Sequence, residues 1–148
     1  PHRCSFVVGG LGAVALEQEL SMEGIAYRSL PTLGGRRRPS SDSPNDGWRV
    51  AAFRGYADYL ATEEFAGGLA ELLMLANGLR TVVMCAEVLW WRCHRRLIAD
   101  HLVLSRGVAV GHVMPGDRVD PHVPTDGVRT GSDGLLYYDA GASALPGV

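Results

Sequence analysis

Residues 81–100 read TVVMCAEVLWWRCHRRLIAD, and this stretch carries the strongest fold signal in the chain. Residues 81–85 are apolar on both faces and mostly β-branched, which is typical of a central strand in a parallel sheet. Residues 93–105 then follow the apolar spacing of a helix, and Gly107 stops that helix. Residues 108–113 form the next expected strand, so the segment predicts a strand-helix-strand unit with a right-handed crossover.

The same alternation of helix and strand runs through the first half of the chain. Residues 13–23 show helical spacing, Gly24 suits a helix C-terminus, and residues 25–30 alternate as a short strand does. Residues 62–76 predict a longer helix with Thr62 as its N-cap. Helices that alternate with strands indicate the α/β class, so we predict a three-layer fold with a mostly parallel sheet and flanking helices.

The chain of 148 residues fits one domain by its length. We predict a single α/β domain over residues 1–116, in which part of the N-terminal region is missing and residues 1–12 carry no firm element. Residues 117–148 are rich in Gly, Pro and Asp. For this tail we expect irregular structure, a small hairpin turned at residues 132–134 and a disordered end.

Composition excludes several functions. The formal net charge of −2 gives no bulk attraction to nucleic acid or to an anionic membrane, so any anion recognition has to be local. No stretch reaches the ~18–20 apolar residues of a membrane span. Three cysteines, an odd number without framework spacing, indicate free thiols in a reducing compartment. We therefore expect a cytoplasmic protein, whose cofactor and oligomeric state the sequence leaves open.

Reactive side chains gather where the strand of residues 81–85 passes into the following helix. Ligands of an open α/β sheet bind beyond the carboxyl ends of its strands, which is where Cys85 lies. The helix that begins near Cys93 brings backbone N–H groups and its positive dipole end to the same place, and Arg92 and Arg95 add donors. Such surroundings lower the pKa of a thiol and favour the nucleophilic thiolate. The pattern predicts a thiolate or anion site.

Each member of this group also has a simpler explanation. Cys85 or Cys93 supplies the thiolate in the reactive interpretation, whereas a cysteine on a buried strand is usually inert. Glu87 and His94 are candidates for proton transfer, but an ion pair with an arginine or a solvent contact would also explain them. The spacing of these residues does not match a zinc knuckle, so we predict no metal site. The histidines His101, His112 and His122 stand alone in the sequence, and a structural or surface role is the simplest explanation for each of them.

The loop PTLGGRRRP at residues 31–39 is a second candidate segment. Gly34 and Gly35 let the backbone approach a ligand closely, while Arg36 and Arg37 surround that ligand with guanidinium groups. A solvated, flexible basic loop explains the same residues equally well. Both explanations stay open from the sequence alone.

Three functional hypotheses follow. In the first, the domain binds a small phosphate- or carboxylate-bearing ligand and acts on it through a thiolate, with Arg36, Arg92 and Arg95 holding the anion and Trp91 lining the site. In the second, a non-catalytic module binds a nucleotide or nucleic acid through the basic loop and the pair Trp90–Trp91. In the third, a structural or interaction domain keeps the same residues in an internal Arg–Glu network.

Four short segments stand in the order of a known family: LPTLGGRR at residues 30–37, FRGYADY at 53–59, CAE at 85–87 and CHRRLIA at 93–99. Together they resemble the domain-of-unknown-function 488 family over about residues 24–113. The resemblance implies a compact bacterial α/β domain with a parallel-type sheet, and it implies no reaction. It adds Tyr56 to the candidate ligand-binding residues. The motif positions that carry over are Gly34, Gly35, Arg36, Tyr56, Cys85, Glu87, Cys93, His94 and Arg95.

The front of the chain departs from this family. Its members usually begin with a strand-helix-strand unit whose strand ends carry a Gly-His-Ser-type and an Asp-Val-Arg-type motif. Residues 1–12 contain neither motif. We therefore expect that unit to be missing from this chain, which would leave the candidate site incomplete.

Overall fold

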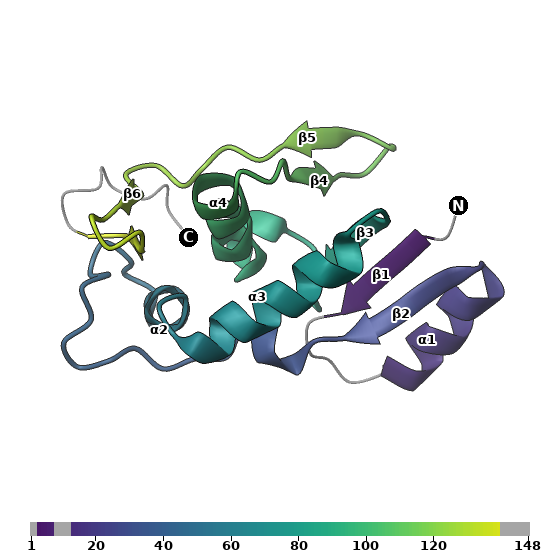
Figure 1. Cartoon of the computed structure of the whole chain (residues 1–148), viewed down its shortest axis with the longest axis horizontal. Coiled ribbons are helices and arrows are strands. Elements are labelled where there is room, and N and C mark those ends of the chain that lie inside the picture. The colour runs from purple at the N-terminus through teal and green to yellow at the C-terminus, as the bar shows by residue number, and fades with distance from the viewer. Residues whose placement is uncertain (1–2, 8–12, 140–148) are drawn as a thin grey trace. The chain divides into compact units, whose positions relative to one another are not determined.

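The computed structural model describes residues 3–7 and 13–139 (Figure 1). The chain divides into two compact units, which we call the sheet unit and, after helix α4 (Arg95–Arg106), the α4 unit. The sheet unit comprises residues 1–35 and 62–88, and the α4 unit comprises residues 36–61 and 89–148. Within the described residues, no helix combines the length and the apolar character that crossing a membrane requires.

A three-stranded parallel sheet forms the centre of the sheet unit, with the strand order β2-β1-β3 (Figure 1). Strand β1 (Arg3–Val7) leads through helix α1 (Ala13–Met22) to strand β2 (Ile25–Ser29), and β3 (Arg80–Met84) pairs with the other side of β1. Gly24 ends α1 at a φ of 67°, which a side chain would disfavour. Helix α1 packs against β2, as expected for a crossover between parallel strands.

Helix α3 (Glu63–Ala76) completes the sheet unit and leads into β3. Thr62 Oγ1 accepts the backbone N–H of Phe65 at 3.2 Å, which confirms the predicted N-cap. The helix packs on the short 3₁₀ helix η1 (Pro31–Leu33). This approach is close because Gly68 has no side chain: a Cβ at that position would lie 2.5 Å from a hydroxyl oxygen of η1.

Helices and two antiparallel strand pairs make up the α4 unit. Strand β4 (Gly111–Val113) pairs with β5 (Val119–Pro121). Strand β6 (Arg129–Thr130) pairs with β7 (Leu136–Tyr137) across the segment where the sequence predicts a small hairpin. Helix α4 ends at Gly107, whose φ of 63° gives the left-handed C-cap that the sequence predicts. The elements in chain order are α2 (Ala51–Tyr59), η2 (Trp90–Arg92), α4 (Arg95–Arg106), β4 (Gly111–Val113), β5 (Val119–Pro121), β6 (Arg129–Thr130) and β7 (Leu136–Tyr137).

Aromatic rings from distant parts of the sequence form the core of the α4 unit. The ring of Trp48 stacks on Phe53 with centroids 4.8 Å apart and meets the ring of Tyr138 at 5.6 Å. The guanidinium of Arg96 lies 5.3 Å from the centre of the Trp48 ring. Asn45 Oδ1 accepts the backbone N–H of Tyr138 at 2.9 Å. The segment around Tyr138 is therefore an integral part of this core.

The predicted three-layer α/β fold with a mostly parallel sheet is wrong. Only three of the described strands are parallel, and the others form two small antiparallel pairs, so the chain has a small α+β fold. Residues 108–113 were expected to extend the parallel sheet, but β4 pairs antiparallel with β5. Strand β3, expected at the centre of its sheet, lies at an edge because β1 takes the central position.

The first residues of the chain also differ from expectation. Strand β1 lies within residues 1–12, to which the sequence assigns no element, and β1, α1 and β2 form a strand-helix-strand unit. The expectation that such a unit is missing is thereby corrected. The predicted disorder at the C-terminus concerns residues 140–148, which lie outside the described residues. The predicted domain boundary at residue 116 stays a prediction.

Candidate functional site

The predicted site residues divide between the two units. The sheet unit contains Gly34, Gly35, Cys85 and Glu87. The α4 unit contains Arg36, Arg37, Tyr56, Trp91, Arg92, Cys93, His94 and Arg95. The convergence of both groups around one hollow, which the sequence suggests, stays a prediction.

Cys85 follows the end of β3 in the sheet unit and forms a tight turn with Glu87. Its Sγ accepts the backbone N–H of Glu87 at 3.3 Å and lies 3.7 Å from the carbonyl oxygen of the same residue. The cysteine is half-buried, whereas Glu87 is exposed. A backbone N–H directed at sulfur favours the thiolate over the thiol.

Gly34 closes η1 in the same unit. Its backbone N–H donates to Pro31 O at 2.9 Å, and a Cβ on Gly34 would lie 2.9 Å from the same oxygen. The geometry of this turn explains the glycine without a ligand. The predicted approach of Gly34 and Gly35 to a ligand stays a prediction.

Cys93 connects η2 to α4 and is only 5% exposed. Its backbone N–H donates to Trp90 O at 3.4 Å, and its Sγ lies 3.5 Å from that oxygen. The Nε atom of Arg95 donates to Cys93 Sγ at 3.1 Å. A guanidinium N–H directed at sulfur favours the thiolate.

His94 immediately precedes α4, and its ring lies against Tyr56, with centroids 5.1 Å apart and an angle of 47° between the planes. Burial lowers the pKa of His94 to about 4, and the positive charge of Arg95 acts in the same direction. The imidazole is therefore neutral at neutral pH and can accept a proton or a hydrogen bond. Its Nε2 is buried without a hydrogen-bond partner among residues 3–7 and 13–139.

Tyr56 is fully buried on α2. Burial, followed by the neighbouring Tyr59, raises the pKa of Tyr56 far above its usual value, so the phenol keeps its proton. The guanidinium of Arg37 lies 3.8 Å from the centre of the Tyr59 ring, a close cation–π contact. Tyr56 and Arg37, both predicted to bind ligand, therefore have clear packing roles.

Three other predicted residues of the α4 unit face solvent. Arg36 and Arg92 are exposed, and neither forms an ion pair with another residue of the described ranges. Trp91 is 36% exposed and meets Trp90 edge to face, with centroids 5.7 Å apart and planes at 88°. These side chains are accessible to a ligand that arrives from water.

A buried polar cluster in the α4 unit was missed by the sequence analysis. Asp100 of α4 is fully buried, and its Oδ1 lies 2.9 Å from His122 Nε2. His122 Nδ1 lies 2.8 Å from His112 Nε2, and the His112 ring stacks on Trp90 at 3.6 Å with nearly parallel planes. The interpretation of His112 and His122 as isolated residues is therefore corrected. The pairing of β4 with β5 brings His112 and His122 together. The spacing of residues in the sequence does not reveal this pairing, so the cluster could not be predicted from the sequence.

Further donors complete the environment of Asp100. The backbone N–H of Thr125 donates to Oδ1 at 2.8 Å, and the hydroxyl of Tyr138 lies 2.9 Å from Oδ2. Burial, with Asp100 adding to the effect, raises the pKa of Tyr138 well above its usual value, so this hydroxyl keeps its proton and donates it. Arg96 Nε donates to Thr125 Oγ1 at 2.8 Å. Asp100 thus acts as an acceptor with its lone pairs well satisfied.

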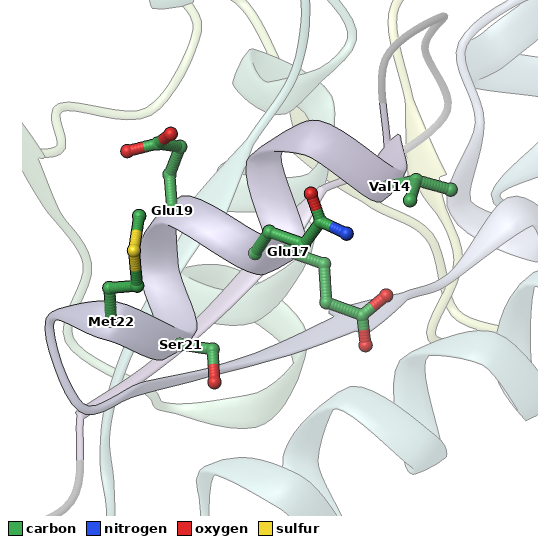
Figure 2. Close-up of a pocket in the computed structure, with 6 residues that line it drawn as sticks. Val14, Glu17, Glu19, Ser21 and Met22 are labelled. Atoms are coloured by element: carbon green, nitrogen blue, oxygen red, sulfur yellow. The ribbon is translucent and has the colours of Figure 1, made fainter.

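None of the predicted site residues lines a hollow on the surface of α1 (Figure 2). Its walls come from a single helix and its lining residues are exposed. We assign it no ligand because it contains no buried polar group. The lining residues are Val14, Glu17, Gln18, Glu19, Ser21 and Met22.

Comparison with known proteins gives one match. A family model with the description "Domain of unknown function DUF488" matches residues 5–102. No curated protein and no solved structure matches the chain. The matched segment contains every predicted site residue as well as Asp100, and it ends before His112 and His122.

Proposed function

Because the chain belongs to the domain of unknown function DUF488 family, we propose its function from the geometry of its own residues. In this proposal the domain binds a small phosphate- or carboxylate-bearing ligand and acts on it through a thiolate. Cys93 supplies the thiolate and His94 accepts protons. The anion is held by Arg36, Arg92 and Arg95.

The contact between Arg95 Nε and Cys93 Sγ at 3.1 Å carries the proposal. A charge-assisted hydrogen bond favours the ionised form of its acceptor, and here it opposes the burial of Cys93, which favours the neutral thiol. Thiolate is the nucleophilic form of cysteine. The pair therefore supports covalent chemistry at sulfur more than a packing role.

His94 supports proton transfer in the same site. It adjoins Cys93 in sequence, is neutral at neutral pH because burial lowers its pKa to about 4, and has a buried Nε2 without a described partner. A buried polar atom without a partner costs free energy in the unliganded protein. A ligand that donates a hydrogen bond to this nitrogen would remove that cost.

Two exposed guanidiniums support anion binding. Arg36 and Arg92 belong to the same unit as Cys93 and form no ion pair with a described residue. Since the net charge of the chain is −2, attraction of an anion has to come from such local groups. A guanidinium also matches the geometry of phosphate and carboxylate oxygens.

Cys85 is the alternative thiolate in this proposal, with Glu87 as the neighbouring proton carrier. A backbone N–H of Glu87 is directed at the Cys85 sulfur at 3.3 Å. Site-resolved labelling of the thiols distinguishes the two.

Binding of a nucleotide or nucleic acid is less well supported. One face of the Trp90 ring is covered by His112, and Arg37 is engaged with Tyr59. Both contacts remove groups that such a module would use for stacking and for phosphate contacts. Steep weakening of binding with added salt would argue for this alternative.

The proposal is tested by alkylating the full chain with iodoacetamide over a range of pH and mapping each cysteine by mass spectrometry. The pH midpoint of alkylation reports the thiolate population. Restricted access of iodoacetamide to a buried thiol slows the reaction at every pH, so a comparison of midpoints is free of this effect. We expect the midpoint for Cys93 to lie below that of free cysteine and below that of Cys85. Inorganic phosphate should slow alkylation of Cys93 in the wild-type chain but less in the Arg92→Gln variant.

Two results would change the conclusion. A midpoint for Cys93 at or above that of free cysteine removes its role as the thiolate. A lowered midpoint confined to Cys85 transfers that role to the alternative residue. The Cys85→Ser and Cys93→Ser variants provide matched controls for the assignment.

A further inference from the structure

His112 lies at the end of a buried chain of polar groups. Asp100 Oδ1 lies 2.9 Å from His122 Nε2, and His122 Nδ1 lies 2.8 Å from His112 Nε2. The side chains of Asp100 and His122 have no exposed surface, and as whole residues His112 and His122 are each 8% exposed. The chain of contacts therefore runs from a fully buried carboxylate to a ring with limited access to water.

The contacts support one assignment of the ring protons. Asp100 accepts hydrogen bonds from Thr125 N–H and from the Tyr138 hydroxyl, so it also accepts from His122 Nε2. We assign Nδ1 of His122 as the acceptor of the Nε2 proton of His112. With its proton on Nε2, the His112 ring has its acceptor lone pair on Nδ1.

His112 remains uncharged in this environment. Burial, followed by His122 and Arg95, lowers its pKa to about 4, against the weaker opposing effects of Asp120 and Asp100. Within the described ranges, Nδ1 of His112 has no hydrogen-bond partner. The ring is therefore an oriented neutral acceptor.

Two residues connect this acceptor to the proposed thiolate. Trp90 stacks its ring on His112 at 3.6 Å, while its carbonyl oxygen lies 3.5 Å from Cys93 Sγ. Arg95 donates to the same sulfur and also interacts electrostatically with His112. Both connections lie within the α4 unit.

We propose that Nδ1 of His112 is a specificity-determining acceptor of the anion site around Cys93 and Arg95, and that it selects oxyanions that carry a hydroxyl group. This inference rests on the proposed function and deepens it by naming the ligand class. Protonated phosphate and 2-hydroxycarboxylates provide the required donor. Sulfate and simple carboxylates do not provide it at neutral pH, and they leave the acceptor unpaired.

Matched pairs of anions test the inference. Inorganic phosphate and sulfate have the same tetrahedral shape, and glycolate differs from acetate by one hydroxyl. Their affinities are measured by NMR titration of the full chain at neutral pH. The test variant is His112→Phe, which keeps a flat ring on Trp90. The control is His101→Phe, the same change at an equally buried histidine outside the chain of contacts.

We expect the wild-type chain and the control to prefer phosphate over sulfate, or glycolate over acetate, by roughly ten-fold or more, the effect of one net hydrogen bond. The pair with the larger ratio identifies phosphate or hydroxycarboxylate as the ligand source. In His112→Phe this preference should disappear while the affinity for sulfate or acetate stays similar. Equal affinities in the wild type, or a preference that survives in His112→Phe, would overturn the inference but leave the anion site intact. Binding of none of the four anions would instead overturn the proposed function.

A second measurement does not depend on the folding of any variant. Long-range proton–nitrogen NMR correlations of the wild-type chain distinguish the two neutral forms of each histidine ring. We expect His112 to carry its proton on Nε2 and His122 to carry its proton on Nε2 as well. A proton on Nδ1 of His112, or a doubly protonated His122, would overturn the inference.

Discussion

Arg95 Nε lies 3.1 Å from Cys93 Sγ, and only His94 separates the two residues in the chain. Such a short separation means that the contact is set by the backbone at the start of α4. It can therefore be removed by a substitution that leaves the buried core of the unit unchanged.

Replacement of Arg95 by Gln should raise the pH midpoint of Cys93 alkylation by about one unit or more, because an adjacent opposite charge stabilises an ion by that amount. Arg92→Gln is the matched control, since Arg92 is exposed and no contact joins it to sulfur in the described structure. Site-resolved labelling measures both variants. Equal shifts of the midpoint in the two variants would show that the pKa of the Cys93 thiol depends on the surrounding positive charge and not on the direct contact with Arg95.

Stability should fall in acid. The pKa values of His94 and His112 are lowered to about 4 from the usual 6.5, so between these values the unfolded chain binds more protons than the folded one. The free energy of unfolding therefore decreases as pH falls from about 6.5 to about 4. Urea unfolding at several pH values measures this slope. His94→Gln should make it shallower, and a flat wild-type profile would contradict the prediction.

Asp100→Asn should destabilise the protein by roughly 3–5 kcal/mol, the usual cost of breaking a buried charged network. The Asn amide would replace an acceptor with a donor that faces other donors. Asp120→Asn is the control, because the ion pair of Asp120 with Arg118 is largely solvent-exposed and should contribute about 0–1 kcal/mol. Denaturant unfolding compares the two. Similar losses in both variants would argue against a special role of the buried carboxylate.

Two glycines in helices should respond oppositely to replacement by Ala. A Cβ on Gly55 of α2 would lie 2.5 Å from Arg37 O and 2.7 Å from Pro39 N, so Gly55→Ala should destabilise by about 1–3 kcal/mol. A Cβ on Gly67 of α3 would meet no atom within 4 Å, so Gly67→Ala should stabilise by about 0.5–1 kcal/mol. Thermal unfolding measures both changes. A stabilising effect of Gly55→Ala would contradict the close approach of the backbone of residues 37–39 to helix α2.

Helix limits could be predicted because their signals are local. Thr62 caps α3 through its own side chain, and Gly107 ends α4 by its left-handed backbone conformation. Sheet membership depends instead on which distant strand supplies the hydrogen bonds. Residues 111–113 pair with the strand that follows them and not with β3, and no periodicity within those residues distinguishes the two outcomes.

The same contrast holds for the candidate site. Cys93 and Arg95 are near neighbours in sequence, so their grouping was visible from spacing. Asp100 and His122 are 22 positions apart and meet only because the β4–β5 pair returns the chain to α4. A carboxylate on the inner face of a helix and a histidine after a strand give no joint signal in one sequence. The most buried polar group of the unit was therefore invisible before the structure.

The segment matched by the family ends at residue 102, yet the groups that satisfy Asp100 come from His122, Thr125 and Tyr138. A truncated version cut at the family limit would keep the Asp100 carboxyl group on α4 and lose every one of these donors. Helix α4 would then have to expose this group to water, and aggregation would follow from the exposed aromatic side chains. Expression boundaries for this domain should accordingly be drawn beyond Tyr138.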